Sequence, residues 1–225
     1  MRIPPAPHRW NVTSREATAI QRHLAPSVRH TRPHTEFRLV VGVDAAFSQD
    51  SAHCVAAAVV WDLQEGNLVE TRTAVRPLTF PYVPGLLSFR EAPAVLAALR
   101  KLRHEPDAIM CDAQGYAHPR RFGLACHIGV ICKRPTLGCA KSVLVGEYRE
   151  PDTTRGSRTA LRHGAVRIGT VLRTRSGVKP VIVSVGHLID LPTAERLVLK
   201  CAVKYRLPEP TRLADHAVAQ AKREM

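Results

Sequence analysis

The sequence lacks a long apolar run. None of its hydrophobic stretches reaches the roughly 20 residues that a membrane-spanning helix needs, and no basic amphipathic helix stands out. Met1–Trp10 has no apolar core of the kind found in a secretory signal. Internal repeats, low-complexity tracts and linker-like segments are missing too. We therefore expect one domain over residues 1–225, monomeric, cytoplasmic and without a membrane partner.

Paired cysteine motifs are also absent. Six cysteines occur, mostly inside apolar segments, and none belongs to a C-x-x-C pair. Buried free thiols in a reducing compartment are the simplest interpretation. His118, Cys126, His127 and Cys132 lack a standard zinc-ligand spacing, so we exclude a zinc site.

Acidic residues are scarce. Lys and Arg number 33 against 19 Asp and Glu, which gives a formal net charge of +14. Such an excess points to a polyanionic partner, either nucleic acid or an anionic membrane surface. Because the membrane signals are absent, nucleic acid is the favoured partner.

The hydrophobic pattern predicts a meander of strands followed by strands that alternate with helices, and therefore a mixed α/β domain. The expected strands are Phe37–Asp44, His53–Asp62, Leu68–Leu78, Asp107–Asp112, Thr136–Cys139, Ala165–Arg175 and Val178–Val185. The expected helices are Thr13–Leu24, Leu86–Leu102, Arg121–Ile131, Thr193–Tyr205 and Thr211–Glu224. Thr13 or Ser14 is the expected N-cap of the first helix, and Thr193 and Thr211 are the expected N-caps of the last two helices. Pro26–Glu36 is predicted to be an irregular crossing segment, and the polar stretch Glu147–His163 a surface loop.

Three carboxylates occupy unusual places in this pattern. Asp44 and Asp112 each end a predicted strand, and Glu91 lies near the start of a predicted helix. If the two strands are neighbours, the carboxylates meet at one rim of the sheet, where two like charges about 4 Å apart cost on the order of 4 kcal/mol. Protonation, pairing with Arg or Lys, or a divalent cation must offset this repulsion. Oxygen ligands of this kind suit Mg²⁺ or Mn²⁺. Taken alone, Glu91 could equally be a charge favoured by the helix dipole.

Several strings together closely resemble endonuclease V, a family of metal-dependent nucleases that cut nucleic acid beside deaminated adenine. They are Val40–Asp44, Pro81–Glu91, Cys111–Gly123, Lys141 and Leu207–Arg212. The resemblance spans most of the chain from about Val40. It implies an RNase H-like fold, in which a mixed central β-sheet is flanked by helices.

The resemblance also implies a catalytic centre. Asp44, Glu91 and Asp112 match positions that bind Mg²⁺ in the family, with Mn²⁺ as a substitute. His118 lies six residues after Asp112 and is expected to contact the phosphate or the attacking water, although a buried structural histidine is the alternative. Lys141 resembles the family lysine near the scissile phosphate.

A fourth acidic contributor is expected near the C-terminus, where family members carry Asp or His after an Arg-x-Ala string. Here Arg212-Leu213-Ala214 is followed by Asp215 and then His216. Neighbouring helical residues point about 100° apart, so the two cannot easily face one metal. Asp215 takes the matching position and is the predicted ligand, with His216 as the lesser candidate.

The Pro81-Tyr82-Val83-Pro84-Gly85 segment predicts a stiff loop. Its two prolines restrict the backbone, so Tyr82 can be held outward to fill the gap left by a flipped base. The family loop acts as such a wedge; a tyrosine packed on the core beside a turn is the alternative.

A base pocket of backbone groups is the second recognition element that we expect. The predicted contributors are Gly85, Leu87, Ala113, Gln114 and Gly115. Many family members have Gly where this chain has Ala113, and the extra methyl would narrow the pocket or restrict φ. Arg120 and Arg121 are expected to hold phosphates.

The implied activity is recognition of deoxyinosine in DNA and hydrolysis of the second phosphodiester bond on its 3′ side. This leaves 3′-hydroxyl and 5′-phosphate ends and initiates DNA repair. Two alternatives remain open: a related nuclease acting on inosine in RNA or on branched DNA, and a nucleic-acid-binding module without catalysis. Residues 1–36, a helix followed by the basic crossing segment, have no assigned role beyond packing on the sheet.

Overall fold

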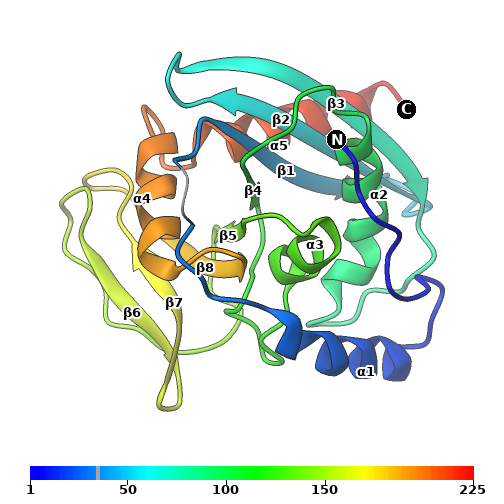
Figure 1. Cartoon of the computed structure of the whole chain (residues 1–225), viewed down its shortest axis with the longest axis horizontal. Coiled ribbons are helices and arrows are strands. Elements are labelled where there is room, and N and C mark those ends of the chain that lie inside the picture. The colour runs from blue at the N-terminus through cyan, green and yellow to red at the C-terminus, as the bar shows by residue number, and fades with distance from the viewer. Residues whose placement is uncertain (34–35) are drawn as a thin grey trace.

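The computed structural model describes residues 1–33 and 36–225, and its centre is a mixed eight-stranded sheet (Figure 1). The strands are β1 (Leu39–Phe47), β2 (His53–Asp62), β3 (Asn67–Pro77), β4 (Ala108–Cys111), β5 (Thr136–Ala140), β6 (Arg158–His163), β7 (Val166–Leu172) and β8 (Val181–His187). The helices are α1 (Ser14–Leu24), the 3₁₀ turn η1 (Ala25–Ser27), α2 (Leu87–Arg100), α3 (Leu124–Cys132), α4 (Leu191–Cys201) and α5 (Glu209–Arg223).

The sheet order is β3-β2-β1-β4-β5-β8-β7-β6. Strands β1, β2 and β3 form the antiparallel meander that the sequence predicts. Strands β4 and β5 then add parallel to β1, and β8, β7 and β6 follow as antiparallel neighbours. The predicted mixed α/β architecture is confirmed.

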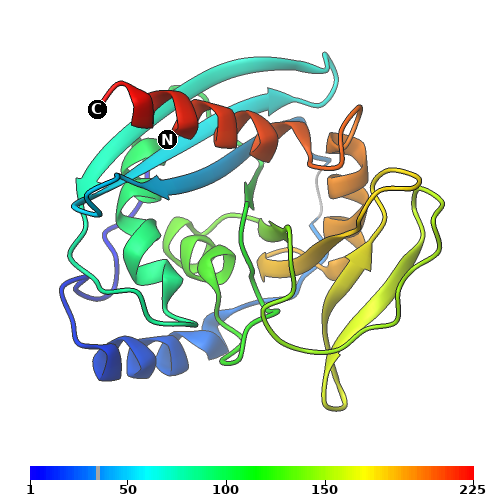
Figure 2. The same cartoon turned by 180° about the vertical axis from the view of Figure 1, so that it is seen from behind.

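Helices cover both faces of the sheet. Helices α2 and α3 lie on the face seen in Figure 1, and α5 crosses the opposite face in Figure 2. The alternation of strand side chains explains the two layers: Val41 and Ile109 pack against α2 and α3, whereas Val40 and Met110 face the cluster that includes α4.

Gly42 sets how closely α5 approaches β1. A Cβ atom at this position would lie 2.1 Å from the backbone carbon of Pro210, so any larger residue would push the start of α5 away from the strand. The absent side chain therefore lets α5 rest directly on β1. Asp215 is carried on this helix and thereby comes close to β1.

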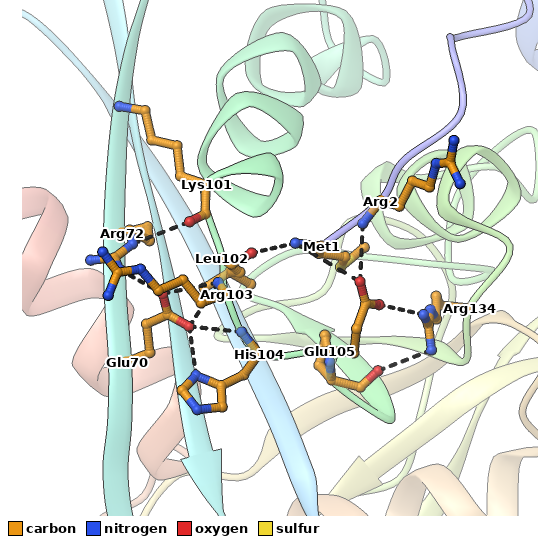
Figure 3. Close-up of polar contacts among 11 residues, drawn as sticks. Met1, Arg2, Glu70, Arg72, Lys101, Leu102, Arg103, His104, Glu105 and Arg134 are labelled. Atoms are coloured by element: carbon orange, nitrogen blue, oxygen red, sulfur yellow. Dashed lines mark hydrogen bonds and ion pairs between the residues drawn. The ribbon is translucent and has the colours of Figure 1, made fainter.

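A remote polar network fixes the loop between α2 and β4 (Figure 3). Glu70 of β3 accepts hydrogen bonds at 3.1 Å from the backbone N–H groups of Arg103 and His104 and pairs with Arg72 at 2.8 Å. Burial favours the protonated form of Glu70, but the bonds from His104 and Arg103 and the Arg72 charge outweigh it and lower its pKa to about 2. Glu105, beside this network, pairs with Arg134 and with the N-terminus of the chain.

Several local predictions are confirmed. Thr13 caps α1 in a capping box with Glu16, and β2 has the predicted bounds. All six cysteines are buried and free. In the part of the chain that the structure describes, no helix is both long and apolar enough to cross a membrane.

Other local predictions are wrong. The expected loop Glu147–His163 contains strand β6, which pairs with β7 although its side chains are mostly polar and exposed. Asp190, not Thr193, caps α4 by accepting a 2.9 Å bond from the Thr193 N–H. Helix α5 begins after Pro208, upstream of Thr211, because its first turn includes Pro210.

Two predicted boundaries need comment. β1 continues past Asp44 to Phe47, because those residues still pair with β2 after the ladder with β4 has ended. The predicted crossing segment Pro26–Glu36 begins inside η1, and its residues 34–35 lie outside the described part of the chain.

Candidate metal centre and base pocket

Three carboxylates from distant parts of the sequence converge. Asp44 lies on β1, Asp112 directly follows β4, and Asp215 lies on α5. The Asp112 N–H donates to the Val43 carbonyl at 3.0 Å, which holds the two strand residues side by side. One oxygen from each of the three carboxylates lies within 4.8 Å of the others, and all three side chains are partly buried. The predicted acidic cluster is therefore assembled in space.

Burial, together with mutual repulsion, raises the pKa values of the carboxyl groups in and beside this cluster. Burial, and then the Asp112 charge, raise the pKa of Asp44 to about 7. Burial also raises the pKa of Asp112. Glu91 of α2 is 8% exposed, and burial together with the charges of Asp44 and Asp112 raises its pKa to about 8. A site where carboxylates resist ionisation is one where a bound cation relieves the repulsion.

Lys141 partly supplies that positive charge. Its Nζ lies 2.7 Å from Asp112 Oδ2 and 3.2 Å from Asp215 Oδ1. Burial favours the neutral amine, but pairing with Asp112 and Asp215 outweighs it and raises the Lys141 pKa. The single ammonium group of Lys141 does not balance the carboxylates around it. An excess of negative charge remains on Asp44, Asp112, Asp215 and the neighbouring Glu91.

The structure distinguishes between the C-terminal candidates. Asp215 reaches the cluster, whereas His216 is exposed on the next position of α5. Glu91 lies close enough for charge interaction, but across residues 1–33 and 36–225 the compact group contains only the three aspartates.

A pocket of about 240 Å³ lies beside the acidic cluster. Its lining brings together the predicted proline-rich loop, the segment after Asp112 and the residues around Lys141. The predicted residues among the lining are Tyr82, Val83, Pro84, Gly85, Leu87, Ala113, Gln114 and His118. Tyr82 is 72% exposed, so its ring extends into solvent at the pocket instead of packing on the core. Pro81, Gly115, Arg120 and Arg121 do not line this pocket.

The Gly85 carbonyl is the anchor of the proline-rich loop. It accepts bonds from Gln21 Nε2 at 3.0 Å, His118 Nε2 at 2.9 Å and Arg120 Nη2 at 2.7 Å. Gly85 adopts a φ of +77°, a conformation that glycine tolerates without strain. Bonds within the protein therefore hold the loop in this shape.

His118 uses both ring nitrogens within the protein. Nε2 donates to Gly85, and Nδ1 accepts from the Arg120 backbone N–H at 3.1 Å. The ring is 3% exposed, and burial lowers its pKa to about 4, so it is neutral at neutral pH. The side chain lines the pocket while it holds the loop in place.

Gln114 presents an unused acceptor. Its Nε2 donates to the Ser142 carbonyl at 2.8 Å, which fixes the orientation of the amide. The side chain is 8% exposed, and within the described residues its Oε1 has no hydrogen-bond partner. Ala113 also lines the pocket, whereas the Gly115 N–H is occupied by Ser184 Oγ at 2.9 Å.

The two predicted phosphate-binding arginines support the surrounding loop. Arg120 contacts Gln21 and Gly85. Arg121 donates to the His118 carbonyl at 3.0 Å and contacts the His163 ring at the same distance. Both guanidinium groups are thus engaged with protein atoms.

Sequence reasoning missed part of the pocket. Gln21, Ser88 and the run Ser142–Leu144 also line it. Gln21 lies 64 residues from its partner Gly85, so no local motif could have revealed the contact. Arg90 was missed as well; its guanidinium stacks 4.4 Å from the Phe47 ring and lies 5.9 Å from the Tyr82 ring.

The acidic cluster and the pocket share two segments of chain. Asp112 belongs to the cluster and the next two residues line the pocket; Lys141 belongs to the cluster and its two neighbours line the pocket. The mixed sheet is RNase H-like, and carboxylates from two strands and a helix meet at one edge of it. This arrangement defines the class of phosphodiester-cleaving enzymes with that fold.

Comparison with known proteins identifies the family. The endonuclease V family model matches residues 22–216. Endonuclease V of Trichormus variabilis is 51% identical over 210 residues, which cover 93% of this chain and 95% of the relative. The crystal structure of endonuclease V from Streptomyces avermitilis has a TM-score of 0.92 at 47% identity and covers 98% of this chain and 97% of that chain. The chain therefore belongs to the endonuclease V family.

A family member has also been crystallised with nucleic acid. Endonuclease V of Ciona intestinalis, in complex with a 23mer DNA containing an inosine followed by a ribo-adenosine, matches with a TM-score of 0.84 at 25% identity. The match covers 95% of this chain and 99% of that chain.

Proposed function

We propose that this protein is a metal-dependent endonuclease that recognises deoxyinosine in DNA. It hydrolyses the second phosphodiester bond on the 3′ side and leaves 3′-hydroxyl and 5′-phosphate ends, the first step in repair of deaminated adenine. The observation that carries the proposal is the adjacency of the acidic cluster and the 240 Å³ pocket, which share the segments around Asp112 and Lys141. A base held in the pocket has its downstream phosphates next to the carboxylates.

The donor set fits Mg²⁺, or Mn²⁺ in its place. All its ligand atoms are carboxylate oxygens. Burial, and then the repulsion between neighbouring carboxylates, raise the pKa values of Asp44 and Glu91, and a divalent cation would offset both effects. Asp44, Asp112 and Asp215 would hold the ion, with Glu91 as the adjoining buried carboxylate. The ion, when bound, would activate a water and shield the charge that develops on the phosphate.

The chain's own residues prepare the reaction around that ion. The Lys141 ammonium, held between Asp112 and Asp215, offers a positive charge to the scissile phosphate. Neutral His118 fixes the loop that carries Tyr82 and Gly85, and through this loop positions the base relative to the carboxylates. Arg120 contributes to the same positioning.

Base recognition rests on Gln114. Hypoxanthine carries a hydrogen on N1, whereas N1 of adenine has none. The unused Gln114 Oε1 is an acceptor for that N1–H, and its fixed amide cannot rotate without losing the bond to Ser142. Exposed Tyr82 would stack into the space that the flipped nucleotide leaves.

A cleavage assay tests the proposal. Duplexes that contain one deoxyinosine, the matching adenine duplex and the inosine RNA counterpart are incubated with Mg²⁺ or with EDTA. We expect cutting one nucleotide beyond inosine, lost in EDTA and in Asp44→Ala but retained in Asp50→Asn, whose carboxylate lies in the exposed β1–β2 turn. Tight binding without inosine-dependent cutting would contradict the proposal and favour a binding module.

The cellular setting follows the same proposal. We propose that the enzyme works in the cytoplasm, where its six buried thiols stay free. We also propose that it is a monomer of one domain. Helix α1 then supports base recognition, since its Gln21 bonds to the Gly85 carbonyl.

A further inference from the structure

A second concave surface is lined by the chain segment that directly follows the base-pocket residues Ser142–Leu144. It is a groove of about 940 Å³ between the segment after Lys141 and the β6–β7 hairpin, and we name it the hairpin groove. Its lining includes Glu147, Tyr148, Arg149, Thr159, Arg162 and His163. Neither the acidic cluster nor the base pocket uses these residues.

The walls of the groove are held together by the backbone. The N–H of Glu147 donates to the Arg162 carbonyl at 2.7 Å, and the N–H of Arg162 donates back at 2.9 Å. Thr159 Oγ1 also bonds to the Arg149 carbonyl. The groove is therefore a built feature of the sheet edge and not a gap between loose loops.

The chemistry of the groove suits single-stranded nucleic acid. Tyr148 is 42% exposed, and its ring stacks on no other aromatic group in the described chain. Arg149 and Arg162 are exposed and form no ion pair within residues 1–33 and 36–225, and the groove has the single carboxylate of Glu147. Arg162 Nη1 donates one bond, to the Ala165 carbonyl at 3.0 Å. An aromatic ring without a stacking partner, beside exposed guanidinium groups without an ion pair, is the combination that binds bases and phosphates of an unpaired strand.

The place of the hairpin groove along the chain connects it with the acidic cluster and the base pocket of the proposed reaction. One continuous segment contributes Lys141 to the acidic cluster, Ser142–Leu144 to the base pocket and Val145–Arg149 to the groove. From the other side, His163 of the groove contacts Arg121, which in turn bonds to the His118 carbonyl at the pocket. Figures 1 and 2 both show the turn between β6 and β7 pointing away from α5, the helix that carries Asp215.

We propose that the hairpin groove binds the nucleotides on the 5′ side of the recognised base as an unpaired strand. The polarity rests on the proposed function, in which the scissile bond lies on the 3′ side of the base, at the carboxylates. Because the segment that begins at Lys141 reaches first the pocket and then the groove, we assign the groove to the 5′ flank. Tyr148 stacks on a base, and Arg149 and Arg162 neutralise phosphates.

Binding measurements with flanks of different length test this assignment. Labelled single-stranded DNA carrying one deoxyinosine keeps a constant 3′ flank, while the 5′ flank is about one, four or eight nucleotides long. Fluorescence anisotropy in EDTA gives Kd without cleavage. We expect Kd to fall about tenfold from the shortest to the middle length and then to level off.

Substitutions locate the effect in the groove. Tyr148→Ala should weaken binding of the longer flanks by about five- to tenfold and leave the shortest flank unchanged. Arg162→Gln should lower the salt dependence of log Kd by about 0.7 for the longer flanks. Tyr205→Ala is the matched control, because Tyr205 is also 42% exposed but lies outside the groove, and it should retain the full length dependence. Thermal melting checks that each variant is folded.

Two results would overturn the inference while leaving the proposed function intact. One is inosine-dependent cleavage with no effect of 5′ length, and the other is a length effect that Tyr148→Ala and Arg162→Gln do not alter. If Kd fell with the length of the 3′ flank instead, and Tyr148→Ala and Arg162→Gln removed that dependence, the assigned polarity would be wrong. Failure of the proposed function would show itself separately, as a Kd and a cleavage rate that are the same for inosine and adenine at every length.

Discussion

Glu70 and Glu91 are equally buried, each 8% exposed, yet their carboxyl groups behave in opposite ways. Glu70 is surrounded by donors, the N–H groups of Arg103 and His104 and the Arg72 guanidinium, and its pKa falls to about 2. Glu91 is buried beside Asp44 and Asp112, and its pKa rises to about 8. At Glu91 burial, and then the charges of Asp44 and Asp112, all raise the pKa, whereas at Glu70 the hydrogen-bond donors and the Arg72 charge outweigh the effect of burial.

The difference in pKa separates Glu70, a carboxylate that stabilises the fold, from Glu91, a carboxylate of the proposed functional site. The Glu70 network fixes the loop that leads into β4, and its hydrogen bonds favour the folded, ionised state. The cluster that includes Asp44 and Asp112 is unfavourable in the folded protein until a cation arrives. Paired substitutions of the two glutamates can test this contrast directly.

The largest expected effect is on catalysis. Glu91→Gln should lower the rate of inosine-dependent cleavage on the order of 10³-fold, because the site loses a carboxylate beside the proposed ion and several kcal/mol of charge stabilisation. Single-turnover cleavage at saturating Mg²⁺ measures this rate. Glu70→Gln, assayed well below its melting temperature, should cut at the wild-type rate; equal losses in both variants would break the contrast.

The second effect is on the free energy of unfolding, where Glu70→Gln and not Glu91→Gln should show the loss. Glu70→Gln should lower the free energy of unfolding by about 2 kcal/mol at neutral pH once solvent screening is allowed for, which corresponds to a fall in Tm of roughly 4 to 8 °C. Denaturant unfolding measures it. Glu91→Gln should show no loss, because a carboxyl group whose pKa is raised to about 8 makes no stabilising ionised interaction at neutral pH.

The pKa of Glu70 also predicts how the stability difference between wild type and Glu70→Gln changes with pH. Because the folded pKa of Glu70 is about 2 against an ordinary value of 4.5, its contribution is complete above about pH 4.5 and is lost as the pH falls towards 2. Wild type and Glu70→Gln should therefore converge in stability under acid. A constant difference between them down to pH 2 would argue against an ionised, hydrogen-bonded Glu70.

The smallest effect is the response to the cation. At a Mg²⁺ concentration of about ten times Kd, binding should stabilise the wild type by about 1.4 kcal/mol and raise Tm by roughly 2 to 4 °C. Asp44→Asn should lose this rise in Tm. Glu70→Gln should show the same rise, starting from a lower Tm in the absence of the cation. An undiminished shift in Asp44→Asn would place the ion elsewhere.

Much of the fold could be predicted from local signals. The apolar run of β2 and the capping box of Thr13 are short-range patterns, and they gave the correct bounds for β2 and the start of α1. Strand β6 was missed because only Leu161 among its residues is buried, so its sequence carries no alternating apolar face. It is a strand because β7 pairs with it, which is a tertiary cause.

The site divides in the same way. Asp44, Asp112 and Asp215 follow from motifs together with the way strands and a helix present their ends. The pairing of Lys141 with both Asp112 and Asp215, and the bond from Gln21 to Gly85, join residues 29 to 74 positions apart in sequence, which no spacing rule describes. Composition predicted a nucleic-acid partner but not where Tyr148 would lie.

The triple hydrogen bonding of the Gly85 carbonyl has a consequence for how tightly a substrate is held. Gln21, His118 and Arg120 order the proline-rich loop during folding, when the chain as a whole is losing its conformational freedom. A base that enters the pocket then meets a preorganised surface and does not have to lose further loop entropy on binding. Under the proposed function, affinity for the recognised base is in this sense partly set by α1, an element that contributes no residue to the acidic cluster.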